Sequence, residues 1–531
     1  MGKWPGSMGA LAGKGTRGYV AAAIVAVAFG LWSPASSAAP PSLPSDTVAA
    51  VNGTPLPRAI FDRAFLKIAE RYAQLGPGLP LDRVWSFRLE ALSRAEEEQL
   101  IRNEARRRKL SVSPREAGKA FDAVVDEQVA QLKEGRGDVE TQFAEFSARL
   151  GGPKQSKMRE AEFRAWLRGW LETRRHDDIV MPLLEGKVKA KVTPPPAVGE
   201  QELRAQFATV TLRAILIRRP QGARDYDAAQ EAARRRAEDL FKQIREGADF
   251  ARLAATVSED QRGKETGGLE KAVLVNRLAP ERQQAVAALK IGEVSGVLPA
   301  SLGYEIVRVE ARGFELPADY EKRKPQLRAQ LAEQKQEAAW EARVKAWREQ
   351  AKVTVTDPEL LGYDLMNQGR KAEAMPWLEA ASRGADRLGA AGAASVYFHL
   401  AAYASAQERW AEAARIYAIC DGYATRVLHL FPEARVATLF GLGFSYENLG
   451  LQGRGRPRTR AEEEAIGKAL AAYQEVGRLT SSPSHHDRLR LSYARLGRPE
   501  LAKQEEVWLA EYYQAAEERQ KAQERKRNER R

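Results

Sequence analysis

The sequence is poor in the two residue types that most often build metal and redox sites. It has one cysteine, Cys420, and five histidines in 531 residues. A single cysteine excludes an intramolecular disulfide, so cysteine usage does not indicate a redox compartment. No histidine occurs between His176 and His399. Any chemistry in that stretch therefore proceeds without imidazole, and we expect no metal and no cofactor.

Long hydrophobic runs are also scarce. The one clear case, "GYVAAAIVAVAFGLW" at residues 18–32, follows Lys3, Lys14 and Arg17 and precedes the small residues "SPASSAAP". This order is typical of a secretory signal peptide, and the run is shorter than the roughly 20 apolar residues of a membrane span. We expect residues 1–39 to be a signal peptide and the protein to act in the periplasm or cell envelope. The alternative is an inner-membrane anchor at residues 18–32.

Positive charge is in excess, with 84 Lys and Arg against 71 Asp and Glu. Part of the excess lies in the basic tail, residues 514–531, which ends "RQKAQERKRNERR". A solvated helix end is the simplest interpretation, and peripheral contact with an anionic membrane is the alternative. Behind an export signal, nucleic acid is not an expected partner.

The length of the chain predicts several domains, and hydrophobic periodicity divides it. The fold class that we expect is multidomain and mainly α, with an all-α N-terminal module, an α+β domain carrying a small antiparallel sheet, and C-terminal α-hairpins. The boundaries that we expect are 40–200 for the helical N-terminal domain, 201–313 for the α+β domain, 314–356 for a long helix, beginning or kinked at Pro325, and 357–513 for the hairpins.

The hairpins share a short sequence pattern. "YASAQERWAEAARIYA" and "YARLGRPELAKQEEVWLAEYY" each place a turn before a small residue and then a bulky one. They resemble tetratricopeptide repeats, which stack because no single hairpin buries its apolar face alone. An irregular helical domain is the alternative. The resemblance implies an envelope protein partner for this domain.

The α+β stretch contains "GADFARLAATVSED", "TGGLEKAVLVNRL" and "GEVSGVLPASLGYEIVRV" in order. Across residues 210–309 it strongly resembles the parvulin (PpiC-type) peptidyl-prolyl cis-trans isomerases. A helical segment opening with "VNG" and a long helix packing on it complete a resemblance to exported foldase-chaperones of the SurA and PrsA kind. The resemblance implies unfolded or newly translocated polypeptides as partners.

The family is implied to use two histidines and a cysteine or aspartate. The first histidine falls on Ala214 and the second on Glu305, whereas Asp260 fits the third position and is the candidate catalytic residue. By resemblance, the substrate-binding pocket positions are Ala214, Leu269, Leu278, Arg282 and Glu305. Arg282 stands where the family usually has an aromatic ring.

Glu305 either points to solvent or faces the former histidine cluster, where an unpaired carboxylate would be costly. We hypothesise that Arg282 pairs with Glu305 or Asp260 and closes the proline pocket. Three functions stay open. The chain is a parvulin-type isomerase and foldase with weak or lost catalysis, a non-catalytic periplasmic chaperone, or a scaffold of an envelope assembly or export machine.

The other candidate groups predict no site. His485 and His486 follow "TSSPS" and are interpreted as loop residues. His399, His429 and Cys420 fall in the hairpins, where packing is the expected role.

Overall fold

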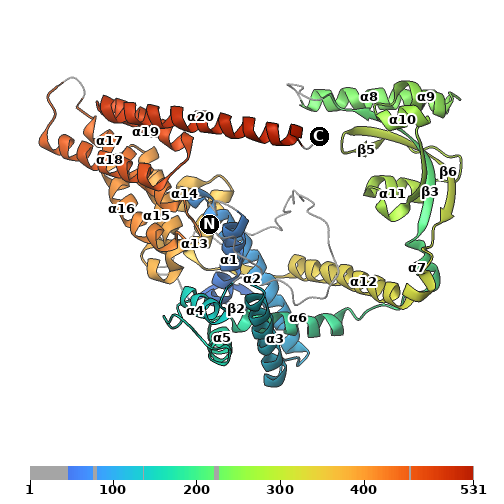
Figure 1. Ribbon diagram of the computed structural model, residues 1–531, viewed down its shortest axis with the longest axis horizontal. Helices are drawn as coiled ribbons and strands as arrows, with labels where there is room; N and C mark the ends of the chain where they lie inside the picture. The colour runs from blue at the N-terminus through green and yellow to red at the C-terminus, as the bar shows by residue number, and fades with distance from the viewer. Residues whose placement is uncertain (1–45, 76–79, 136, 221–225, 454–455, 530–531) are drawn as a thin grey trace. The chain divides into compact units, whose positions relative to one another are not determined.

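The computed structural model describes residues 46–75, 80–135, 137–220, 226–453 and 456–529 (Figure 1). The expected signal peptide lies outside these ranges. The chain divides into two compact units, the first made of residues 1–188 and 344–531 and the second of residues 189–343. Helices dominate and the sheets are small and antiparallel, so the predicted fold class is confirmed. Within the described ranges, no helix combines the length and the apolar character needed to cross a membrane.

The first unit opens with a hairpin of β1 (Thr47–Val51) and β2 (Thr54–Pro57). Asn52 and Gly53 at its tip have φ angles of 51° and 77°, which a tight hairpin turn requires. On its other side β1 pairs with β7 (Val353–Val355), giving the order β2-β1-β7. Segments about 300 residues apart therefore share one sheet.

Helices then fill the rest of the N-terminal part. They are α1 (Arg58–Leu75), α2 (Val84–Arg107), α3 (Pro114–Lys133), α4 (Val139–Arg149), α5 (Glu160–Arg174) and α6 (His176–Val192). The start of α3 shows why the chain turns helical where it does. Ser113 and Glu116 form a reciprocal capping box and Pro114 occupies the first helical position.

The C-terminal part of the first unit is a series of helices in which each contacts the next. They are α13 (Pro358–Asn367), α14 (Lys371–Ser382), α15 (Gly389–Ala406), α16 (Trp410–Ala424), α17 (Ala434–Gly450), α18 (Arg460–Leu479), α19 (Pro483–Arg495) and α20 (Pro499–Glu529). The interpretation of His485 and His486 as loop residues is wrong, because α19 already begins at Pro483.

One hydrophobic core joins both ends of the first unit. It contains Val48 of β1, Phe61 of α1 and Leu92 of α2 together with Leu378 of α14 and Phe431 beyond α16. All of these side chains are at most 5% exposed. The N-terminal helices and the first C-terminal hairpins therefore form one packed body.

The second unit contains a four-stranded antiparallel sheet in the order β4-β3-β6-β5. Its strands are β3 (Ala208–Arg218), β4 (Leu269–Leu274), β5 (Leu298–Ala300) and β6 (Gly303–Phe314), and its helices are α7 (Glu200–Ala205), α8 (Tyr226–Arg245), α9 (Phe250–Val257), α10 (Gln261–Thr266), α11 (Pro280–Ala288) and most of α12 (Tyr320–Gln350). Pro325 lies in the second turn of α12, so the helix begins before the proline that was expected to start or kink it.

The two faces of this sheet are covered differently. Ile215 and Ile217 of β3 pack against α8 and α9, where Ala233 and Phe250 are buried. Leu212 faces the opposite way and shares a small core with Val286 of α11. Because side chains alternate along a strand, Ala214 lies on the face covered by α11.

Candidate functional site

Strand register gathers the site on the α11 face of the sheet. β3 lies between β4 and β6, with Leu212 opposite Glu270 of β4 and Leu216 opposite Glu305 of β6. Residues that face one another across neighbouring strands project to the same side. Glu270 and Glu305 therefore flank the row that contains Ala214.

Arg282 bridges these two carboxylates from the first turn of α11. Its Nη2 donates to Glu270 Oε1 at 2.6 Å, and its Nε lies 3.8 Å from Glu305 Oε1. Because β3 runs between the strands that carry the two glutamates, the bridge passes over β3 near Ala214. The methyl side chain of Ala214 leaves room there for the guanidinium.

Burial shapes the electrostatics of the bridge. The side chains of Arg282 and Glu305 are 15% and 13% exposed. Burial raises the pKa of the Glu305 carboxyl, Arg282 lowers it, and Glu270 and Glu281 raise it again. Since Arg282 is shared between Glu270 and Glu305, and Glu281 adds a further negative charge, the charged form of Glu305 is incompletely compensated. Glu305 thus faces Arg282 rather than solvent.

Asp260 has a different set of contacts. Its Oδ2 accepts from the Gly263 backbone N–H at 2.8 Å and caps the N-terminus of α10. The turn before it packs on β3, because Ser258 Oγ accepts from the Leu216 N–H at 3.2 Å. The ionic partners of Arg282 are the two glutamates and not Asp260. A catalytic role for Asp260 stays a prediction.

The two leucines that were predicted to line the pocket lie in different places. Leu278 is 9% exposed and belongs to the small core under α11. Leu269 pairs with Arg213, so it projects to the other side of the sheet from Ala214. The structure brings together Ala214, Leu278, Arg282 and Glu305, and it adds Glu270. The sequence held one indication of Glu270, namely Arg282. An arginine in a partly buried position where the family usually has an aromatic ring needs a carboxylate nearby.

Comparisons with known proteins identify the families to which two parts of the chain are similar. Residues 215–311 match the family model described as "Rotamase: PPIC-type PPIASE domain" and residues 14–174 match that of the SurA-like N-terminal domain. The chain carries a PPIC-type PPIase domain behind a SurA-like N-terminal domain. The predicted resemblance to SurA- and PrsA-type parvulins is therefore confirmed, whereas the exact domain boundaries and the tetratricopeptide character of the C-terminal helices stay predictions.

Individual relatives are distant. The chain is 28% identical over 127 residues to foldase protein PrsA of Clostridium botulinum, covering 24% of this chain and 38% of that one. It is 34% identical over 125 residues to chaperone SurA of Alkalilimnicola ehrlichii, covering 24% and 29%. These matches span less than two fifths of either relative. The crystal structure of PrsA from Bacillus anthracis aligns at 21% identity over 47% of this chain and 92% of that chain, with a TM-score of 0.24.

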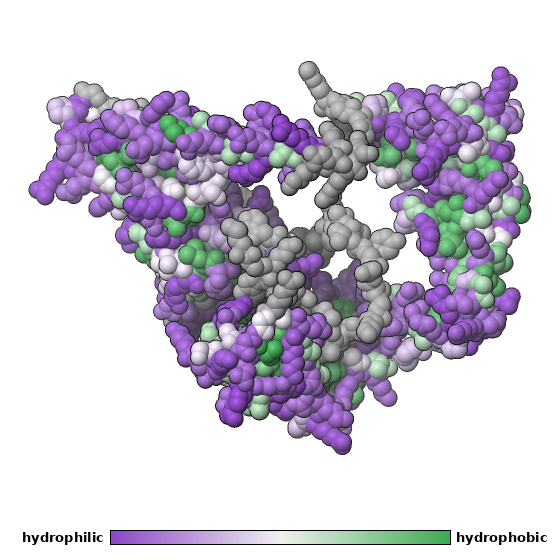
Figure 2. Space-filling model, in the orientation of Figure 1, coloured by the Kyte–Doolittle hydropathy of each residue, from purple (hydrophilic) through white to green (hydrophobic). Residues whose placement is uncertain are grey.

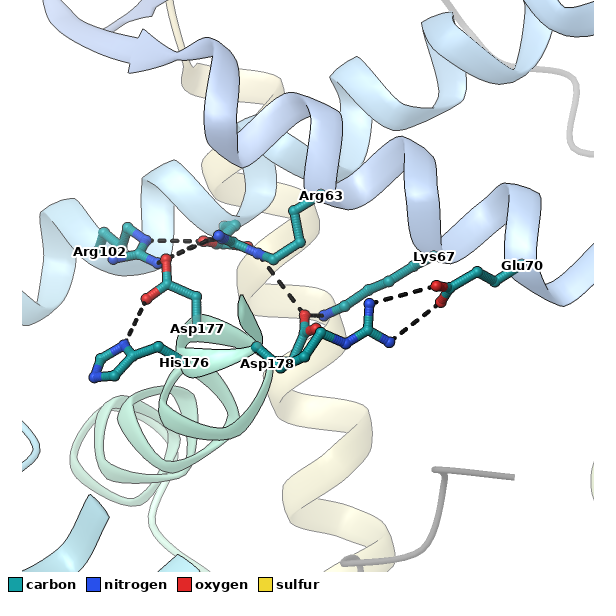
Figure 3. A network of polar contacts seen from close by, with 9 residues as sticks. Arg63, Lys67, Glu70, Arg102, His176, Asp177 and Asp178 are labelled. Atoms are coloured by element: carbon teal, nitrogen blue, oxygen red, sulfur yellow. Dashed lines mark hydrogen bonds and ion pairs between the residues drawn. The ribbon is translucent and has the colours of Figure 1, made fainter. Parts of the chain in front are cut away.

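Outside the PPIase domain, a polar network joins the start of α6 to α1 and α2 (Figure 3). Asp177 Oδ2 lies 2.8 Å from Arg63 Nη1 and 2.9 Å from Arg102 Nη2, and Asp178 Oδ1 lies 2.9 Å from Lys67 Nζ. Arg175 Nε pairs with Asp178 as well, at 3.0 Å. Each acidic group here already has a cationic partner, so the network fastens α6 and is not a binding site.

A second ionic cluster is buried in the shared core of the first unit. Arg88 is 1% exposed and its Nη2 donates to Glu359 Oε2 at 2.7 Å. Arg58 pairs with Asp357, the residue that caps α13. The Arg88 guanidinium also lies over the Phe61 ring at 4.7 Å. The cluster ties α1 and α2 to α13.

His399, His486 and Cys420 are packing residues, whereas His429 is exposed in the turn before α17, so the packing prediction is wrong for His429. Burial lowers the pKa of His399 to about 4 and raises the pKa of the Cys420 thiol to about 12. His486 is 4% exposed, with its ring stacked on Trp508 and its Nδ1 2.5 Å from Glu505 Oε2. Among the residues that the structure describes, no group of three or more His, Cys, Asp and Glu could hold a metal ion.

Proposed function

We propose that the chain is an exported foldase-chaperone that binds unfolded, newly translocated polypeptides in the periplasm or cell envelope. Its PPIase domain is a peptide-binding module with weak or no isomerase activity. The matches to a PPIC-type PPIase domain and to a SurA-like N-terminal domain support the foldase-chaperone class. Matching relatives are named foldase PrsA and chaperone SurA.

The Arg282 bridge is the observation that supports weak catalysis. Rotation about an X-Pro bond crosses a barrier of roughly 18–20 kcal/mol, so a catalyst must grip the proline ring and stabilise the twisted amide. Ala214 offers no polar group, and the Glu305 carboxylate faces Arg282. The positions at which the family resemblance implies histidines therefore hold a methyl group and an ion pair.

The test is cis-trans isomerisation of short X-Pro peptides by the full chain, across several residues before the proline. We expect a rate close to the uncatalysed one for the wild type and for Asp260→Ala alike. If the wild type clearly accelerated isomerisation and Asp260→Ala did not, Asp260 would be catalytic and the chain would be an active isomerase.

The chaperone part is tested separately. On the face shown in Figure 2, hydrophobic residues form small separate patches within a mainly hydrophilic surface. Phe314 and Ile291 are large hydrophobic side chains with 68% and 62% exposure. Patches of this kind suit weak binding of many sequences. We expect the full chain to suppress aggregation of several unrelated unfolded proteins.

A scaffold is the second candidate, and one observation favours it. A groove between α16 and α17 is lined by Ala411, Ala414, Ala418 and Leu449, with Ile419 40% exposed beside it. Small residues let a bound segment approach the helices closely. A scaffold would capture one envelope protein there and leave unfolded clients aggregating.

The two ends of the chain are proposed to determine its location, through cleavage of a signal peptide and through membrane contact of the basic tail. Cleavage after residue 38 or 39 would leave a mature chain that begins near Ala39 or Pro40, which N-terminal sequencing of the protein from its host would detect. In the basic tail, Arg519, Lys521 and Arg525 are exposed on α20 and suit peripheral contact with an anionic membrane. Co-sedimentation with anionic but not neutral vesicles would support that contact.

A further inference from the structure

Arg282 covers the face of the PPIase domain to which the strand register brings Ala214. The bridge has one strong side, the 2.6 Å hydrogen bond to Glu270, and one weak side, the 3.8 Å ion pair with Glu305. Arg282 Nε is buried and has no hydrogen-bond acceptor among the described residues. The guanidinium is thus held across the sheet without being fully satisfied.

We propose that Arg282 is the specificity-determining residue of this face. Bridged to Glu270 and Glu305, it keeps clients off the sheet, and when it is released it uncovers an apolar surface that takes a neutral, proline-containing segment. This inference rests on the proposed function, since it assumes that the domain binds client peptides.

The residues beneath the bridge support that choice of ligand. Leu278 and Val286 form the buried floor, and Ala214, Val273 and Leu289 pack against it while staying partly exposed. These side chains carry no polar atoms, so they suit an apolar segment such as a proline ring.

The charges around this face also restrict which client peptides can bind. At the Glu305 end of this face, Glu270 and Glu281 both act on Glu305, and Arg282 is the cation that opposes them. Arg312 lies at the other end, where its Nη2 donates to Leu289 O at 2.6 Å. With the guanidinium displaced, the surplus of carboxylates would repel an acidic client. A client with a neutral residue before its proline is therefore preferred to one with glutamate there.

The bridge is able to open because it is only partly shielded. Glu270 is 37% exposed, and partly exposed ion pairs are weakened by salt. A neutral peptide has no charge of its own for salt to screen. Its affinity for the wild type should therefore rise with salt, because salt frees Arg282.

The experiment measures binding of a fluorescently labelled tetrapeptide, with alanine before its proline, to the full chain by anisotropy at low and high salt. We expect Arg282→Ala to bind at least tenfold more tightly than the wild type at low salt and to lose the salt dependence. Arg277→Ala is the matched control, because Arg277 is exposed beside Leu278 at the end of the preceding short helix. It should behave as the wild type.

Two further arms complete the design. Glu270→Gln removes the strong anchor and should also raise affinity, and a peptide with glutamate before its proline should gain less than the neutral one in every variant. An Arg282→Ala protein that keeps the circular dichroism and melting temperature of the wild type but binds no better would overturn the inference. So would equal gains for a peptide without proline.

This outcome is distinguishable from failure of the proposed function. If the full chain leaves unfolded clients aggregating but Arg282→Ala gains peptide affinity, the chaperone role fails and the role of Arg282 stands. If unfolded clients are protected from aggregation but Arg282→Ala gains no peptide affinity, the chaperone role stands and the role of Arg282 fails.

Discussion

Arg88 and Glu305 are both shielded charged residues, but their surroundings differ. Arg88 has a short hydrogen bond to Glu359 and two aromatic rings beneath its guanidinium. The nearest cation to Glu305 is 3.8 Å away and is shared with Glu270. The first charge is closely paired within its cluster, whereas the second reduces the stability of the fold around it.

Arg88→Met should therefore destabilise the first unit strongly. The substitution leaves Glu359, which is fully buried, without its main partner. Breaking a buried pair in this way costs about 3–5 kcal/mol. Calorimetry of the full chain would show a lower melting temperature for the first unit. Arg94→Met, on the same helix but 50% exposed, should change stability by less than about 0.5 kcal/mol, and equal effects of the two would contradict the prediction.

Glu305→Gln should stabilise the second unit at neutral pH. Because burial raises the pKa of Glu305 in the folded state, folding favours its protonated form, and the charged form lowers stability above that pKa. The loss is recovered as the pH falls towards the ordinary value of 4.5. We expect a melting temperature a few degrees above wild type at about pH 7.5 and no difference at about pH 4. The exposed control Glu265→Gln should show no such gain, and an advantage that persisted in acid would count against this reading.

At the scale of elements, helix starts were predictable where side chains define them locally. Ser113, Pro114 and Glu116 signal a helix in the sequence and begin α3 in the structure. The serines and proline before His485 are the same kind of signal. The loop prediction there is wrong because Pro483 occupies the start of a helix, where a proline is tolerated, and does not break one. Serine and proline residues are therefore enough to mark a boundary, but the same residues are compatible with a loop and with the start of a helix.

Elements that depend on distant partners were not predictable. β7 is three residues long, and its identity as a strand comes from its pairing with β1. The same holds for the site, where the sequence supplied Arg282 and Glu305 but not Glu270, whose place beside them is set by the register of β3 and β4. Register also decides the face on which a residue lies, and it places Leu269 on the face opposite Ala214.

The element that a single charge should loosen is α6. Asp178 lies in its first turn and faces Lys67, Arg63 and Arg175, so Asp178→Lys would place like charges together at the positive end of the helix dipole. We expect amide hydrogen exchange across residues 176–192 to become roughly tenfold faster, which corresponds to about 1.4 kcal/mol of local stability. Exchange in α13 should be unchanged.

A charge swap is the control for that prediction. Lys67→Asp combined with Asp178→Lys restores the opposite signs at the 2.9 Å contact and should recover part of the protection. If the double variant exchanged as fast as Asp178→Lys alone, the contact between α1 and α6 would not be what holds the helix.

At the scale of the whole molecule, the first unit is discontinuous in sequence and the second is continuous. A chain that ends after Arg343 would lack β7, Asp357 and Glu359, so Arg58 and Arg88 would lose the carboxylates that they contact there. We expect such a chain to lose the cooperative melting of its N-terminal module, and the fragment 189–343 to melt cooperatively by itself. A truncated chain that kept both transitions would show that the shared core is dispensable.

The pairing of β1 with β7 also sets an order of events during synthesis. β1 leaves the ribosome roughly 300 residues before the strand that completes its sheet. In that interval the middle unit can finish folding, while the apolar faces of α1 and α2 wait uncovered for the first hairpins. During its own synthesis the N-terminal module is therefore an incompletely folded polypeptide of the kind that the protein is proposed to bind.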